Sequence, residues 1–226
     1  GFAITLKRTK TKVKNKFKSN ECEYIILVGS ENGTTFGFAN QIHLQLQTNG
    51  KKSFFFFLNH YTEFPQAKQL IVFTSTYGLG EAPTNASKFE ELLKQFPQKQ
   101  NIAYSVIGFG SKSYPDFCKY AKDIDKLLLE QSWADQALKL YTVNDKSADE
   151  FTSWVTDWAK LNSLAMATAP SLYRQKLPKL TKLTLVDKAE ITPDDTTTFR
   201  LNLKPSSLVK FKSVDLVAIY PKNNAL

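Results

Sequence analysis

Three times along the first half of this chain, a run of β-branched and aromatic residues ends in a short loop that contains glycine. The runs predict buried strands at residues 24–28, 70–74 and 102–107. The carboxyl ends of parallel strands meet at one edge of an open α/β sheet, which is where such sheets bind ligands. The pattern therefore predicts one site built from three loops, at residues 29–35 (GSENGTT), 75–80 (STYGLG) and 108–114 (GFGSKSY).

The segments between these loops complete one doubly wound domain. A strand is expected at residues 53–58, where four consecutive phenylalanines require burial on both faces of a sheet. A fifth strand is expected at residues 137–143, and a closing helix at residues 149–164. Asn85 has the residue type and position of a helix cap. We therefore predict an α/β fold with a five-stranded parallel sheet and helices on both faces.

The pattern changes after residue 164. Residues 165–179 have the composition of a linker, and three short alternating segments at 182–191, 196–203 and 213–220 predict antiparallel strands. Three strands are too few for a stable barrel, so we expect the truncated start of a second domain. The expected organisation is a basic arm (1–20), the α/β domain (21–164), the linker (165–179) and the start of a β-domain (180–226).

The formal charge of +9 is concentrated in the amino-terminal arm, where seven basic residues precede the first acid, Glu21, leaving +2 for the rest of the chain. Nucleic-acid binding needs basic residues interleaved with aromatic ones on a folded face, so it is not expected. Residues 1–6 are apolar but too few to cross a bilayer. Two interpretations remain: the end of a membrane helix whose basic flank meets an anionic membrane surface, or a solvated, disordered tail.

The first loop has the composition of an anion site. Backbone amides at the start of a helix, supplemented by the hydroxyls of Ser30, Thr34 and Thr35, bind a phosphate without a cation. A Walker-type loop would end in GK[ST], but Thr34 and Thr35 stand at the lysine and hydroxyl positions. Nucleoside triphosphate hydrolysis is therefore not expected, and a monophosphate is the predicted guest.

The second and third loops each carry a tyrosine. Tyr77 and Tyr114 could sandwich a planar ring, while Gly78, Gly80 and Gly110 let backbone groups approach its edge. A phosphorylated planar ligand is thus predicted. No metal site is expected, because the two cysteines and two histidines are isolated along the sequence. A receiver domain would need acidic residues after the first strand and a phosphoacceptor Asp after the third, and this chain has Gly29-Ser30 and Ser75-Thr76 there.

These three motifs, with Phe117 and Cys118 following the third, resemble the flavodoxin-like FMN domain of diflavin reductases, the family of the sulfite reductase flavoprotein and microsomal cytochrome reductase. The likeness covers about residues 24–160, and residues 215–224 resemble the segment that opens the family's FAD-binding barrel. Glu31 replaces a usual Gln, which puts a carboxylate beside the phosphate loop. The family's acidic turn before the last helix is reduced to Asn144-Asp145.

The resemblance implies that FMN is the cofactor, with its phosphate in the first loop and its ring between the other two. The candidate cofactor-binding residues are Ser30, Glu31, Asn32, Gly33, Thr34, Thr35, Ser75, Thr76, Tyr77, Gly78, Gly80, Gly108, Gly110, Ser111, Tyr114 and Phe117. No catalytic side chain and no metal ligand are expected, because the flavin carries the chemistry.

The resemblance also implies an oxidoreductase in which NADPH reduces FAD, and electrons then pass through FMN to a haem or iron acceptor. The FAD and NADPH domain of the same chain would be a partner, and this chain alone should bind FMN without oxidising NADPH. A cytoplasmic location on the inner face of a membrane is expected if the arm follows a membrane helix. The alternatives are a free-standing flavodoxin-type electron carrier and a flavodoxin-fold signalling or binding domain.

Overall fold

The computed structural model describes residues 2–5, 15–31, 33–174, 181–192, 198–208 and 218–219, the first and last of these ranges by their backbone alone. The chain divides into two compact units. The larger is Thr11–Gln175, and the smaller combines Gly1–Lys10 with Lys176–Leu226.

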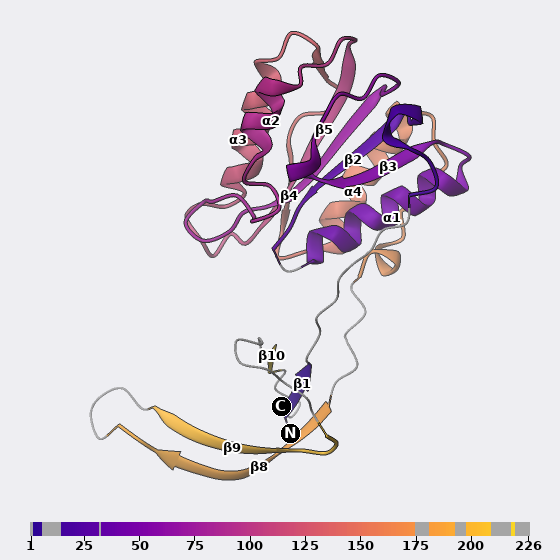
Figure 1. Ribbon diagram of the computed structural model, residues 1–226. Coiled ribbons are helices and arrows are strands. Elements are labelled where there is room, and N and C mark those ends of the chain that lie inside the picture. The colour runs from indigo at the N-terminus through magenta and orange to yellow at the C-terminus, as the bar shows by residue number, and fades with distance from the viewer. Residues whose placement is uncertain are drawn as a thin grey trace. The chain divides into compact units, whose positions relative to one another are not determined.

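The larger unit is a parallel sheet with the strand order β3-β2-β4-β5, and β6 and β7 both lie beside β5 (Figure 1). This is a doubly wound order, and its switch point lies between β2 and β4. The strands are β2 (Tyr24–Gly29), β3 (Ser53–Phe57), β4 (Gln69–Ser75), β5 (Ile102–Gly110), β6 (Ala134–Gln136) and β7 (Tyr141–Asn144). The predicted parallel sheet is confirmed.

The fifth strand differs from the prediction, because residues 137–143 do not form one continuous strand. β6 pairs with β5 up to Tyr104, and β7 resumes the pairing at Ile107. Residues 137–140 therefore lie opposite only Ser105 and Val106, so the two stretches cannot share one register. The chain leaves the sheet between them and returns at Tyr141.

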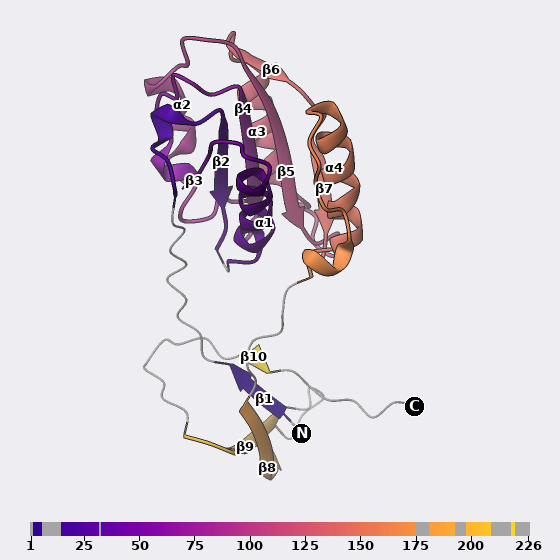
Figure 2. The ribbon, with the colours of Figure 1, turned by 90° about the vertical axis from the view of Figure 1, so that its right-hand side faces the viewer.

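Helices cover both faces of the sheet, as Figure 2 shows, with α1 and α4 on one side and α2 and α3 on the other. They are α1 (Thr34–Thr48), α2 (Phe89–Gln95), α3 (Lys119–Leu129) and α4 (Ala148–Leu161). Along β2, Ile26 and Val28 face the core with α1 and α4, whereas Ile25 and Leu27 face the core with α2 and α3. Two-sided burial explains why the strands read as continuous apolar runs.

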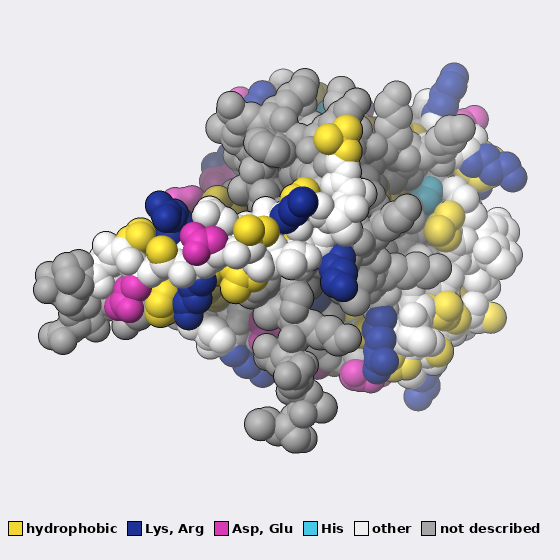
Figure 3. All heavy atoms as spheres, turned by 90° about the horizontal axis from the view of Figure 1, so that it is seen from below, with side chains coloured by type: hydrophobic (Ala, Val, Ile, Leu, Met, Phe, Trp, Pro, Cys, Tyr) yellow, Lys and Arg dark blue, Asp and Glu magenta, His cyan; other side chains and the backbone are white. Residues whose placement is uncertain are grey.

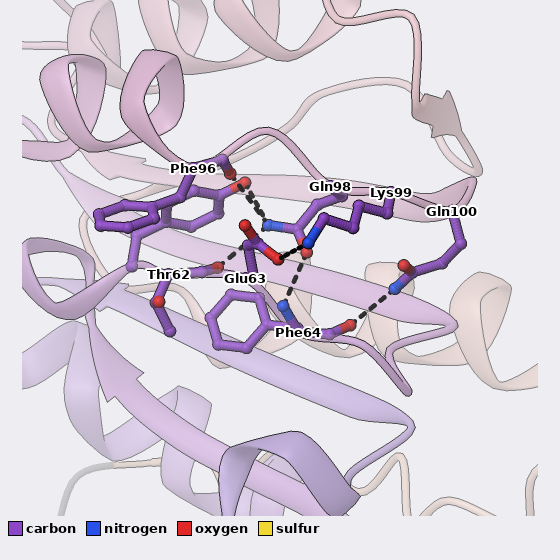
Figure 4. Close-up of polar contacts among 8 residues, drawn as sticks. Thr62, Glu63, Phe64, Phe96, Gln98, Lys99 and Gln100 are labelled. Atoms are coloured by element: carbon purple, nitrogen blue, oxygen red, sulfur yellow. Dashed lines mark hydrogen bonds and ion pairs between the residues drawn. The ribbon is translucent and has the colours of Figure 1, made fainter.

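A buried glutamine fastens the loop that follows β3. Gln98 is 6% exposed, and its Oε1 accepts a 2.8 Å hydrogen bond from the Phe64 N–H, as Figure 4 shows. Its Nε2 donates to the Tyr61 hydroxyl at 2.8 Å and to the Thr62 carbonyl at 3.0 Å. The loop backbone is therefore satisfied inside the protein rather than by water.

Both flanks of the predicted domain extend further than expected. The Asn15 side chain exchanges two hydrogen bonds with the Phe55 backbone (3.1 and 2.8 Å) and so covers the edge strand β3. At the other end, Tyr173 is buried against Phe151, and its hydroxyl accepts a 2.6 Å hydrogen bond from Gln45. Residues 15–20 of the predicted arm and residues 165–174 of the predicted linker thus pack on the α/β unit.

The smaller unit is an antiparallel sheet in the order β10-β1-β8-β9. Its strands are β1 (Phe2–Thr5), β8 (Thr181–Glu190), β9 (Phe199–Pro205) and β10 (Ala218–Ile219). Of the antiparallel strands predicted after the linker, the first two are present as β8 and β9 and are compatible with the start of a barrel. Most of the third, predicted at 213–220, lies outside the described residues, and only its residues 218–219 are seen, as β10. Figure 3 shows hydrophobic side chains among charged ones along the β8–β9 ribbon, where Val186 is 64% exposed.

Residues 2–5 correct one expectation. We expected them to be the end of a membrane helix or a solvated tail, but they form β1, which pairs with β8 on one side and β10 on the other. In the described part of the chain, no helix is both long and apolar enough to span a membrane. Residues 6–14 and most of the motif at 215–224 lie outside the described residues.

Candidate functional site

A cavity of about 760 Å³ opens at the carboxyl ends of the strands, beside the switch point of the sheet. Loops after β2, β4, β5 and β7 line it. The sequence thus correctly predicted that three glycine-bearing loops meet at one site. The predicted residues that line the cavity are Ser30, Glu31, Thr34, Thr35, Ser75, Thr76, Tyr77, Gly78, Gly110, Ser111, Tyr114 and Phe117.

The remaining predicted residues do not line the cavity or cannot be placed. Asn32 lies outside the described residues. Gly33 provides the turn into α1, as described below. Gly108 allows close packing of α3, since a Cβ there would lie 2.6 Å from the Ala121 Cβ, whereas Gly80 provides a turn, with φ of 98°. These three glycines shape the loops without lining the cavity.

The first loop presents the amino terminus of α1. Gly33 is the residue that precedes the helix, in the left-handed conformation with φ of 73°, and as a glycine it has no side chain of its own to cap the helix. The Ser30 hydroxyl accepts a 3.1 Å hydrogen bond from the Gly33 N–H, which closes the turn. The first turn of α1 contains no acidic residue and begins with Thr34 and Thr35. Such a helix start attracts anions.

Glu31 borders the cavity, but both of its carboxylate oxygens bind a residue of another loop. Oε2 accepts a 2.8 Å hydrogen bond from the Thr84 N–H, and Oε1 accepts one of 2.9 Å from the Thr84 hydroxyl. The next residue, Asn85, does not cap a helix as predicted, because α2 begins only at Phe89. Its side chain instead binds the backbone of Ser30.

The second loop holds Tyr77 at the mouth of the cavity. The backbones of Tyr77 and Glu81 exchange two hydrogen bonds, of 2.9 and 2.7 Å, which close a tight turn. Gly78 and Gly80 within it have φ of 51° and 98°, which side chains rarely tolerate. Tyr77 is 52% exposed, and Tyr114 of the third loop is 67% exposed. Two largely exposed aromatic rings thus border one cavity.

The third loop packs closely against the start of α3. A Cβ at Gly110 would lie 3.0 Å from the Cys118 N and 3.1 Å from its Sγ. Cys118 is buried and lines the cavity, and burial raises the pKa of its thiol to about 11. The thiol is therefore protonated at neutral pH and brings no negative charge to the cavity.

A fourth loop, which was not part of the predicted site, completes the cavity. Asp145 and Lys146 line it, with φ of 45° and 62°. Among the described lining residues, Lys146 is the only cation. This turn contains no glycine, so the signals for it were its position after a strand and the family's acidic turn, which is reduced here to Asn144-Asp145. The other lining residues that were missed are Phe109, Ser113, Asp116 and Cys118.

The comparisons with known proteins agree with this geometry. The flavodoxin family model matches residues 26–158. The chain is similar to two proteins named sulfite reductase [NADPH] flavoprotein alpha-component. That of Mannheimia succiniciproducens is 27% identical over 88% of this chain and 36% of the relative. That of Vibrio cholerae is 32% identical over 60% of this chain and 22% of the relative.

Solved structures give the same fold. A flavodoxin from Streptococcus pneumoniae superposes with a TM-score of 0.52 at 24% identity, over 62% of this chain and 97% of that one. Flavodoxin 2 from Bacillus cereus has a TM-score of 0.52 at 18% identity, over 61% of this chain and 98% of that one. The chain spans about a third or less of the two sulfite reductase relatives, and nearly the whole of these flavodoxins. Given the match to the family model over more than half of its length, the chain belongs to the flavodoxin family.

Proposed function

We propose that the larger unit binds FMN and serves as the electron-transfer module of an NADPH-dependent diflavin reductase similar to the sulfite reductase flavoprotein. One observation carries this proposal: a single cavity combines the start of a helix that is preceded by glycine and two exposed tyrosines. The first suits a phosphate and the second suits a planar ring.

The residues present fit the whole ligand. The volume of about 760 Å³ lies in the range of small-molecule pockets, which is about 300–1,000 Å³. At one end, the amides at the start of α1 and the hydroxyls of Ser30 and Thr35 would bind the phosphate. At the other, Tyr77 and Tyr114 would flank the isoalloxazine, and the backbone at Gly78 and Gly110 would approach its edge.

The chain would bind, orient and tune the cofactor rather than react. FMN, when bound, would supply one-electron and two-electron transfer. No side chain of the cavity needs to act as an acid, base or nucleophile. The protonated Cys118 thiol and the Glu31 carboxylate bound by Thr84 fit this supporting role.

The relatives support a wider function. Both are named sulfite reductase [NADPH] flavoprotein alpha-component, which connects those proteins to NADPH and to sulfite reductase. We infer that FAD, reduced by NADPH, passes electrons to the FMN, and that the FMN reduces a haem or iron acceptor. An FAD and NADPH domain of the same chain would be the donor, and the strands β8 and β9 are compatible with the start of its barrel.

Flavin titration tests the core of the proposal. FMN added to the purified chain is expected to bind at one site with micromolar or tighter affinity, with a shifted visible spectrum and quenched flavin fluorescence. Riboflavin should bind more weakly, because it lacks the phosphate that the first loop would hold. An absence of binding at micromolar FMN would overturn the assignment.

A further inference from the structure

Asn85 binds both backbone polar groups of Ser30. Its Oδ1 accepts a 2.9 Å hydrogen bond from the Ser30 N–H, and its Nδ2 donates one of 3.0 Å to the Ser30 carbonyl. Ser30 is only 8% exposed, and its hydroxyl in turn accepts from the Gly33 N–H at the start of α1. Asn85 thus holds the first loop where it leaves β2, much as a neighbouring strand would.

Thr84 binds the next residue of the same loop. Its backbone N–H and its hydroxyl bind the two carboxylate oxygens of Glu31, at 2.8 and 2.9 Å. A carboxylate that turned toward the start of α1 would repel a bound phosphate, because like charges at short range oppose each other. The two hydrogen bonds hold the carboxylate against Thr84.

The segment that carries Thr84 and Asn85 is itself fixed from two directions. Asn59, which follows β3, donates to the Asn85 carbonyl from its backbone and to the Thr84 carbonyl from its side chain, both at 2.9 Å. On the other side, the Tyr120 hydroxyl of α3 donates to the Ala86 carbonyl at 2.8 Å. Because these hydrogen bonds fix the segment, Thr84 and Asn85 can position the first loop.

We propose that Thr84 and Asn85 are positioning residues for the phosphate loop. Asn85 fixes the backbone of Ser30, and Thr84 keeps the Glu31 carboxylate away from the bound phosphate. This inference rests on the proposed binding of FMN. Neither residue lines the cavity, so both act through the first loop rather than on the ligand.

Paired titrations with FMN and riboflavin test the proposal, because only FMN carries the phosphate. Asn85→Ala is expected to raise the Kd for FMN about tenfold and to change that for riboflavin less than about twofold, the size of effect that one or two hydrogen bonds produce. Ser87→Ala is the matched control, since the exposed Ser87 hydroxyl donates only to the Thr84 carbonyl of its own segment. It should leave the ratio of the two Kd values unchanged.

The role of Thr84 is tested through the charge of Glu31. Thr84→Val should raise the Kd for FMN about threefold or more by loss of one hydrogen bond to the carboxylate. In a Glu31→Gln background, the same substitution should have little effect, because no charge remains to be held away. An equal loss in both backgrounds would overturn the role of Thr84. For Asn85, an equal loss of FMN and riboflavin affinity in a folded variant would overturn the proposal.

Inorganic phosphate separates this inference from the proposed function. Phosphate binding can be followed through the amide resonances of residues 33–35 without any flavin ring. A wild-type chain that binds phosphate but not FMN would overturn the proposed function, and the effect of Asn85→Ala on phosphate affinity would still decide the role of Asn85. A chain that binds neither would overturn both. Should Asn85→Ala fail to fold by circular dichroism, the exposed substitution Thr84→Val decides the inference.

Discussion

The backbone N–H of Asp145 donates a 2.8 Å hydrogen bond to the carbonyl oxygen of Gly110. This contact continues the pairing of β7 with β5, which ends at the same glycine. Asn144 adds a second contact, since its Oδ1 accepts a 2.7 Å hydrogen bond from the Lys112 N–H. The third glycine loop is therefore positioned by two strand ends, and Gly110 lies at the centre of the contacts.

A side chain at position 110 should disturb this arrangement. In Gly110→Ala the new Cβ would lie 3.0 Å from the Cys118 N, so the start of α3 would have to move. We expect the free energy of unfolding to fall by about 1–3 kcal/mol, as is typical of overpacking. The affinity for FMN should fall as well, because the displaced residues line the cavity. Urea unfolding and flavin titration measure the two effects.

Ser113→Ala is the control for this substitution. Ser113 lines the same cavity and is exposed, so removing its hydroxyl should change the unfolding free energy by no more than about 0.5 kcal/mol. If Gly110→Ala matched this control in both stability and flavin affinity, the close approach of the loop to α3 would not matter.

Replacing either exposed tyrosine should weaken flavin binding with little effect on folding. Tyr77 and Tyr114 are 52% and 67% exposed, so their rings contribute little to the core. Stacking on a flavin is worth about 0.5–1.5 kcal/mol per ring, which corresponds to roughly a two- to thirteenfold rise in Kd for Tyr77→Ala or Tyr114→Ala. Residual flavin fluorescence in the complex should also rise. Phenylalanine at either position should retain most of the affinity, and an alanine variant with wild-type affinity and quenching would show that its ring does not stack.

The hydrogen bonds of Gln98 should affect the stability of the fold and not the binding of flavin. Gln98→Ala would leave the buried Phe64 N–H without its partner, at a cost of about 1–3 kcal/mol in unfolding free energy. Neither residue lines the cavity, so flavin affinity should be unchanged. Lys99→Ala is the matched control from the same turn: its ion pair with Glu63 is exposed and should contribute no more than about 1 kcal/mol. Equal losses in the two variants on urea unfolding would contradict this account.

The sequence predicted the parts of the fold that local chemistry determines. Strands that are buried on both faces are continuous apolar runs, and the glycines that follow them mark where the backbone turns. The predicted bounds of β2, β4 and β5 therefore agree with the observed bounds to within a few residues. The meeting of their loops at one cavity followed from the geometry of parallel sheets.

Features that depend on distant partners could not be read in the same way. Asn85 stands where a helix cap is common, yet its partner Ser30 lies on another loop, and no local pattern reports that choice. The interrupted fifth strand reflects its register against β5, which exists only once the sheet has formed. Tyr173 lies in a segment with the composition of a linker, yet its ring packs against Phe151 of α4. A single aromatic residue in such a segment gives no pattern that would predict this contact.

Acidification should destabilise the protein through His43. The ring is 1% exposed, with Nδ1 2.9 Å from the Ser53 hydroxyl and Nε2 3.0 Å from the Gln47 amide nitrogen. Burial lowers the pKa of this histidine in the folded state, whereas the unfolded chain takes up the proton near pH 6.5. The contribution of His43 to stability is therefore complete above about pH 6.5 and is lost as the pH falls from there toward the folded-state pKa.

The His43→Gln variant tests this pH dependence of stability, because glutamine keeps hydrogen-bonding groups and does not titrate. Urea unfolding at several values between pH 7.5 and 5 should show a decline for the wild-type protein that is steeper than for the variant, by at most about 1.4 kcal/mol per pH unit for one proton. Other groups titrate in both proteins and cancel in the comparison. Parallel declines would mean that His43 becomes charged as readily in the folded protein as in the unfolded chain, which its burial beside Phe55 and Ser53 argues against.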